Sequence, residues 1–130
     1  MPKVTTTTPE GAPVPIGPYS HVARVGTSIT IGGVAGVDPG TGSLAGSNVE
    51  AQTRQILKNM AALLASADSD LQQVVHVNVF LLHMSDFEEM NRVYAECMGP
   101  HRAARTVIGV HELPKPGVLL TMNLTAVTTS

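Results

Sequence analysis

The sequence has one cysteine, no tryptophan and few charged side chains. The single cysteine, Cys97, excludes a disulfide within the chain and suits a reducing compartment, so we expect a cytoplasmic protein. Charged residues make up only 14% of the chain, whereas hydrophobic residues make up 43%. Disordered chains have the opposite balance. The composition therefore predicts a globular fold, and the shortage of charge indicates that another subunit covers part of its surface.

Long apolar runs and net positive charge are also missing. No run approaches the roughly 20 apolar residues that span a bilayer, and the first residues lack the apolar core of a signal peptide. The formal net charge is -2 and aromatic residues make up 3% of the chain. Little is therefore present to attract phosphates or to stack bases. We expect neither a membrane protein nor a protein whose main partner is nucleic acid.

The length fits one domain over residues 1–130. Residues 1–15 combine a threonine tract with Pro9, Pro13 and Pro15 and predict an irregular N-terminal arm. Two short strands are expected at 21–25 and 29–33, with a glycine-containing turn between them. Residues 36–47 are dense in glycine and contain an Asp-Pro-Gly turn signal, which predicts a loop.

Two helices are predicted from capping pairs and residue periodicity. Ser47 and Glu50 lie three residues apart, as in the capping box that begins many helices. The positions that follow are spaced three and four apart and share one helix face: Val49, Thr53, Ile56, Met60, Leu63 and Leu64. Ser85 and Glu88 repeat the capping pair before a second helix, which we expect to end at Gly99.

Residues 74–82 give the strongest strand signal, because β-branched residues dominate the segment and both alternating sets are largely apolar. Such a strand is buried on both faces, which a helix on one side and a partner subunit on the other would explain. Two more strands are expected at 105–110 and 118–127. The order of elements predicts an α+β sandwich with both helices on one face of the sheet.

Most catalytic constellations are absent from the sequence. The five histidines show no metal-binding spacing, and the glycines near residue 33 do not form a dinucleotide-binding fingerprint. Cys97 lacks the flanking pattern of a nucleophile and is expected to be a partly buried small side chain. No lysine lies inside an apolar strand, which disfavours Schiff-base catalysis. We therefore expect no metal and no cofactor.

Two places remain that could carry chemistry. In residues 16–20 a Gly-Pro pair fixes the backbone directly before Tyr19, although the same pattern is typical of a turn before a strand. Arg105 begins an apolar strand. It could form an ordinary surface ion pair, or its planar guanidinium could grip a carboxylate with two hydrogen bonds.

The chain resembles the Rid family of reactive intermediate (imine/enamine) deaminases, also called the YjgF family. The resemblance runs from about residue 12 to 127 and rests on five segments in register: residues 16–20 (IGPYS), 38–42 (DPGTG), 91–94 (NRVY), 104–106 (ART) and 113–114 (LP). It implies a chorismate-mutase-like protomer of the bacillus type. It also implies a homotrimer with a barrel-like core and three sites at the subunit clefts.

The resemblance implies hydrolysis of 2-imino acids or 2-enamino acids to 2-oxo acids and ammonia, with a small carboxylate-bearing substrate. Arg105 matches the family arginine that binds the substrate carboxylate, and Tyr19 matches the tyrosine that closes the site. Asn91 matches an asparagine on the second helix. Gly33 matches the glycine whose backbone lies beside the ligand.

The chain departs from the family pattern at four positions. Gly32 and Val34 replace the serine and glutamine of a Ser-Gly-Gln segment, and Val107 replaces a cysteine or threonine. The family glutamate that helps to hold the attacking water falls on Thr121 with a one-residue insertion, and on Leu120 without it. Neither residue is a carboxylate.

Three functions remain open at this point. The chain could be a deaminase in which Arg105 holds the carboxylate, Tyr19 packs over the ligand, and Thr121 or the Val107 carbonyl orients water. It could be a trimer that binds small carboxylates without catalysis, since the acidic group is lost. It could also act on a bulkier enamine such as aminomuconate, because Gly32 and Val34 widen the pocket and make it less polar. Members of the family have also been called endoribonucleases, which the net charge does not favour.

Overall fold

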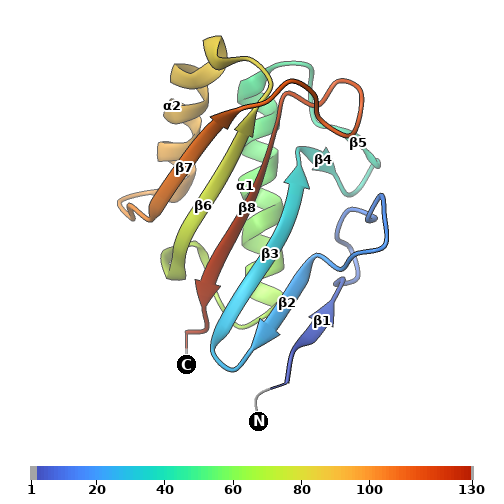
Figure 1. Ribbon diagram of the computed structural model, residues 1–130, viewed down its shortest axis with the longest axis vertical. Coiled ribbons are helices and arrows are strands. Elements are labelled where there is room, and N and C mark those ends of the chain that lie inside the picture. The colour runs from blue at the N-terminus through green and yellow to red at the C-terminus, as the bar shows by residue number, and fades with distance from the viewer. Residues whose placement is uncertain (1–2, 130) are drawn as a thin grey trace.

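The computed structural model describes residues 3–129. Its main feature is a mixed sheet of six strands in the order β1-β2-β3-β8-β6-β7, in which β6 and β7 are parallel and the other pairs antiparallel (Figure 1). The strands are β1 (Thr5–Thr7), β2 (Val22–Val25), β3 (Ser28–Ala35), β6 (Val74–Leu81), β7 (Ala104–Gly109) and β8 (Leu120–Val127). A separate hairpin joins β4 (Val37–Asp38) to β5 (Ser43–Leu44). β8 is a central strand, and β7 forms one edge of the sheet.

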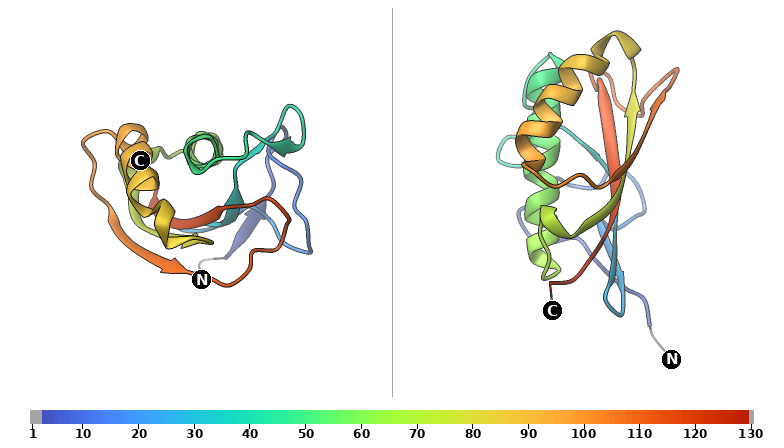
Figure 2. Two further views of the ribbon diagram at one scale, coloured as in Figure 1. Left: turned by 90° about the horizontal axis from the view of Figure 1, so that it is seen from above. Right: turned by 90° about the vertical axis from the view of Figure 1, so that its left-hand side faces the viewer.

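Two helices, α1 (Val49–Ser66) and α2 (Phe87–Met98), cover the same face of the sheet (Figure 2). Single 3-10 turns, Leu71–Gln73 and Met84–Asp86, precede β6 and α2. The face of α1 predicted from periodicity is buried against the sheet, with Ile56 and Met60 fully enclosed. The predicted α+β fold with both helices on one sheet face is confirmed. No helix among residues 3–129 is both long and apolar enough to cross a membrane.

Both predicted capping boxes are wrong. The N-cap of α1 is Asn48, whose side-chain oxygen accepts a hydrogen bond of 2.8 Å from the Ala51 backbone N–H. The helix thus begins one residue later than Ser47 would place it. Ahead of α2, the 3-10 turn takes up Ser85, so the N-cap is Asp86 and makes no side-chain capping bond.

Two segments predicted to be irregular contain short strands. Thr5–Thr7 pair with β2 and extend the sheet by an edge strand, so the N-terminal arm is irregular only in part. Residues 1 and 2 of that arm lie outside the described residues. The predicted loop at 36–47 contains the β4–β5 hairpin, whose strands of two residues are too short to show an alternating pattern.

Strand β6 is buried on one face only within this chain. Val77, Val79 and Leu81 are enclosed by the helices, whereas the opposite face is partly open to solvent. The pairing between β6 and β8 shifts between Val74 and His76, so Val74 is buried and Val75 is 53% exposed, although strict alternation would put Val75 on the buried face with Val77. The partner subunit expected on the open face stays a prediction.

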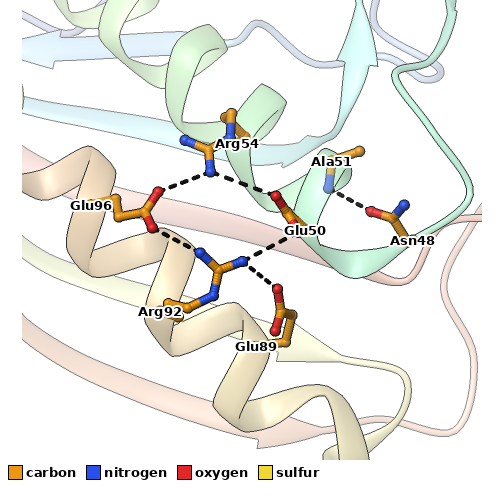
Figure 3. A network of polar contacts seen from close by, with 7 residues as sticks. All are labelled: Asn48, Glu50, Ala51, Arg54, Glu89, Arg92 and Glu96. Carbon is orange, nitrogen blue, oxygen red and sulfur yellow. Dashed lines mark hydrogen bonds and ion pairs between the residues drawn. The ribbon is translucent and has the colours of Figure 1, made fainter.

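A charged network joins the outer surfaces of the two helices (Figure 3). Arg92 of α2 contacts Glu50 of α1 at 3.2 Å, and Arg54 of α1 contacts Glu96 of α2 at 2.9 Å. The hydrogen bond from Arg54 lowers the pKa of Glu96, and the one from Arg92 lowers the pKa of Glu89, below the ordinary value of 4.5. The network therefore supports helix packing at neutral pH and weakens when these carboxylates are protonated in acid.

Candidate functional site

A cavity with a volume of about 930 Å³ lies beside β3 and the beginning of β8. Its other walls are the chain before β2, the β4–β5 hairpin and the loop that leads into β8. Apolar side chains and prolines supply most of the lining: Ala12, Pro13, Val14, Pro15, Ile16, Val34, Ala35, Val37, Pro39, Pro114 and Val118. Polar and glycine positions complete it: Tyr19, Ser20, His21, Gly32, Gly33, Gly42, Lys115 and Thr121. No aspartate or glutamate of residues 3–129 lines this cavity.

The segment before β2 forms one wall through its own hydrogen bonds. The Tyr19 backbone N–H donates to the Gly17 carbonyl at 2.9 Å, and the Ile16 N–H donates to the Tyr19 hydroxyl at 3.3 Å. The ring of Tyr19 stands edge-on to the buried His21 ring, with the centroids 5.8 Å apart. Tyr19 is 43% exposed, so it lies at the rim, where it can cover a ligand.

The floor of the cavity comes from β3 and β8. The register between these strands shifts between Ile31 and Val34, which places Gly32 and Gly33 in a bulge. Thr121 pairs with Ala35 and lines the cavity, whereas Leu120 is fully buried in the core. Of the two alignments considered for the family glutamate, only the one at Thr121 falls on a cavity residue.

A buried glutamine that sequence reasoning missed holds the loop that leads into β8. Gln52 of α1 donates to the carbonyls of Gly46 at 2.9 Å and Gly117 at 3.0 Å, and it accepts from the Leu119 N–H at 2.8 Å. Its side-chain amide thus joins a helix to two loops. The sequence offered one sign of this role: Gln52 is a polar residue next to Thr53, on the face of the predicted helix that was expected to be buried.

Arg105 lies at a different place, between the edge strand β7 and α2. Its Nη2 donates to Asn91 Oδ1 at 2.7 Å, and its Nη1 lies 3.9 Å from the Met90 sulfur. The guanidinium carbon lies 4.7 Å from the centroid of the Tyr94 ring, which gives a cation–π contact. No carboxylate among residues 3–129 approaches this partly buried cation within 4.0 Å.

Tyr94, whose ring packs near Arg105, is a poor proton carrier at neutral pH. Burial raises the pKa of Tyr94, against an opposing effect of the positive charge on Arg105. Elsewhere on α2, near Arg54 and Glu96, burial raises the pKa of Cys97, which is partly buried and packs against the core, as predicted. A protonated thiol is a weak nucleophile. Arg105 therefore offers this region hydrogen bonds and charge rather than acid–base chemistry.

The predicted site residues fall into two groups that a single chain keeps apart. Tyr19, Gly33 and Thr121 line the cavity, whereas Arg105, Asn91 and Val107 are not among its lining residues.

The two groups also use different faces of the sheet. Arg105 contacts α2, so it lies on the helix-covered face. On β8 the neighbours of Thr121, Leu120 and Met122, are buried on that face, so alternation puts Thr121 on the open face. A ligand that touches both Arg105 and Thr121 therefore needs two copies of the chain.

Comparison with known proteins gives consistent matches over nearly the whole chain. Residues 9–128 match a family model described as endoribonuclease L-PSP. A RutC family protein of Pyrococcus horikoshii is 43% identical over 106 residues, which cover 82% of this chain and 84% of that protein.

A human relative and a solved structure carry more informative names. The human protein named 2-iminobutanoate/2-iminopropanoate deaminase is 38% identical over 104 residues, which cover 80% of this chain and 76% of that protein. The crystal structure of RidA from the Antarctic bacterium Psychrobacter is 32% identical in sequence. It superposes with a TM-score of 0.89 over 95% of this chain and 98% of the other.

Proposed function

The chain belongs to the Rid family, which the matching family model describes as endoribonuclease L-PSP, and on this premise we propose that it hydrolyses 2-imino and 2-enamino acids to 2-oxo acids and ammonia. The name of the human relative supports a 2-imino acid substrate. The cytoplasmic location expected from the single cysteine stays a prediction.

The observation that carries the proposal is a guanidinium without an acidic partner. Asn91 occupies one Nη of Arg105 and the Tyr94 ring packs near its face, so the orientation of the guanidinium is fixed. Its remaining N–H groups have no carboxylate within 4.0 Å among residues 3–129. A substrate carboxylate supplies the missing charge and can accept two of these hydrogen bonds. Asn91 is then a positioning residue for Arg105.

The proposed site forms between two copies of the chain in a homotrimer. Arg105, with the Val107 backbone beside it on the edge strand, comes from one copy, and the cavity with Tyr19, Gly33 and Thr121 comes from the next. The half-covered face of β6 and the low charge of the chain are consistent with such an assembly around a barrel-like core.

The reaction needs little beyond positioning, because the carbon of a protonated C=N bond is already electrophilic. Arg105 holds the carboxylate, Tyr19 covers the ligand, and the backbone at Gly33 lies along it. Thr121 or the Val107 carbonyl accepts a hydrogen bond from the water that attacks the carbon. The C–O bond forms, the two protons of the water end on the nitrogen and the solvent, and the C–N bond breaks to release ammonia and the 2-oxo acid. Positioning of this kind contributes several kcal/mol to such a step.

Release of pyruvate from enzymatically generated 2-aminoacrylate tests the activity. We expect the protein to accelerate pyruvate formation over the rate in buffer. We also expect a rate below that of relatives with a glutamate, since a positioned base contributes about 10²- to 10⁴-fold. A rate equal to that in buffer, for 2-aminoacrylate and for 2-iminobutanoate, contradicts the proposal.

A second candidate function is binding of small carboxylates without turnover. The absence of aspartate and glutamate from the cavity lining within residues 3–129 favours it, because no acid–base group replaces the family glutamate. Calorimetry with 2-oxobutyrate beside the activity measurement separates the two, since affinity without turnover identifies a binding protein. An enamine bulkier than 2-aminoacrylate, such as aminomuconate, is compatible with the cavity volume of about 930 Å³.

A further inference from the structure

Within one copy of the chain, before a neighbouring copy contributes Arg105, the cavity is larger and less polar than a three- or four-carbon imino acid requires. Its volume of about 930 Å³ is near the upper end of the roughly 300–1,000 Å³ that holds drug-sized ligands. Prolines and aliphatic residues form most of its walls. A substrate that extends beyond the reacting C=N group therefore has room, and the lining decides which extension is favoured.

One lysine gives this apolar lining a positive charge. Lys115 lines the cavity together with Thr121, and no other lysine or arginine of residues 3–129 does so. Lys115 is partly buried, and within these residues its ammonium makes no ion pair and no hydrogen bond. No acidic residue of the lining balances its charge. A negatively charged group on the ligand would complement the positive charge of Lys115.

The backbone around Lys115 is held in place before any ligand binds. Pro114 and Pro116 flank the residue and restrict its backbone. The Lys115 carbonyl accepts a hydrogen bond from the Val118 N–H at 3.3 Å, and the Gly117 carbonyl accepts one from Gln52 at 3.0 Å. Because the loop backbone is already ordered, ligand binding costs little conformational entropy there. Lys115 therefore favours a ligand group that lies at a set distance from the rest of the site.

We propose that Lys115 binds a second, distal carboxylate, so that the preferred substrates are 2-imino or 2-enamino dicarboxylates. This inference rests on the proposed function, in which Arg105 of a neighbouring copy holds the carboxylate next to the C=N carbon. The reacting carbon then lies at Thr121, and the chain beyond it crosses the apolar part of the cavity towards Lys115. A monocarboxylate of equal length leaves Lys115 without a partner.

Calorimetry with two product analogues of equal chain length tests the preference. 2-Oxoglutarate carries a distal carboxylate, and 2-oxopentanoate carries a methyl group at the same place. We expect 2-oxoglutarate to bind roughly tenfold more tightly, which corresponds to one charge-assisted hydrogen bond. Lys115→Gln should remove this difference and Lys115→Arg should retain most of it. Lys58→Gln, on an exposed face of α1, should leave the difference unchanged.

Equal affinity for the two ligands, tighter binding of 2-oxopentanoate, or a preference that survives Lys115→Gln overturns the inference. Turnover of 2-iminobutanoate is measured on the same samples. Turnover without a dicarboxylate preference removes the inference and leaves the proposed function. A Lys115-dependent preference without turnover removes the deaminase activity and leaves the dicarboxylate site. If neither 2-oxo acid binds and nothing is turned over, both fail.

Discussion

Replacing Arg105 with alanine is expected to lower kcat/KM for 2-iminobutanoate by about 10²- to 10³-fold. The variant loses the charge-assisted hydrogen bonds to the carboxylate and, with them, the position of the C=N carbon relative to water. Arg105→Lys should recover only a small part of this loss, because an ammonium cannot form the paired, planar contact. Asn91→Ala should have a smaller effect, mostly on KM, since it frees the guanidinium that Asn91 holds at 2.7 Å.

Arg102→Ala is the matched control for this experiment. Arg102 is exposed, donates to the backbone carbonyls of Gly99 and His101, and does not line the cavity. We expect its activity to stay near that of the unmodified protein. Circular dichroism and the mass of the assembly show whether each variant keeps its fold and its oligomeric state. Equal activities of the Arg105 and Arg102 variants in intact assemblies contradict the carboxylate role.

Replacing Gly36 with alanine is expected to reduce the free energy of unfolding by about 3 kcal/mol or more. A Cβ atom at this position would lie 2.7 Å from the Gln52 carbonyl oxygen and 2.8 Å from the Gln52 Cα. Both atoms belong to the backbone of α1, so no side-chain rotation relieves the contact. The helix must move away from the sheet, which also disturbs the hydrogen bonds of Gln52 to the loop before β8.

Gly33→Ala provides the comparison, because a Cβ there meets no atom within 4 Å. We expect it to change the free energy of unfolding by less than about 1 kcal/mol. Urea denaturation of both variants measures the difference. If Gly36→Ala unfolds at the same urea concentration as Gly33→Ala, the close approach of helix and sheet at residue 36 does not constrain the fold.

The helices and long strands could be predicted because their patterns are local. The face of α1 and the strand at 74–82 both follow from side-chain spacing. Short elements could not be predicted in this way: β1 depends on pairing with β2 further along the chain, and the two-residue strands of the β4–β5 hairpin are too short to show a pattern. Each helix start was wrong by one residue. For α1 the reason is that Ser47 and Asn48 are both good N-caps, and the local sequence does not choose between them.

The candidate site shows the same division between local and distant information. Motifs in the sequence identified Tyr19, Arg105 and Asn91 together, but not that Arg105 and Thr121 lie on opposite faces of the sheet, which depends on strand order and register. The role of Gln52 depends in part on the loop before β8, whose Gly117 lies 65 positions from Gln52 in the sequence. Lys115 and Tyr19 line the same cavity, although 96 positions separate them in the sequence.

Subunit complementation tests most directly whether the site forms between copies of the chain. One variant is Arg105→Ala, and the other is Gly33→Trp, whose new side chain fills the cavity. We expect each to be inactive alone. The two variants are then unfolded and refolded together in equal amounts. In about a quarter of the sites, a Gly33→Trp copy supplies Arg105 and the neighbouring Arg105→Ala copy supplies an open cavity, so about a quarter of the unmodified protein's activity should return. If the mixture contains mixed assemblies and remains inactive, Arg105 and the cavity of neighbouring copies do not form one site.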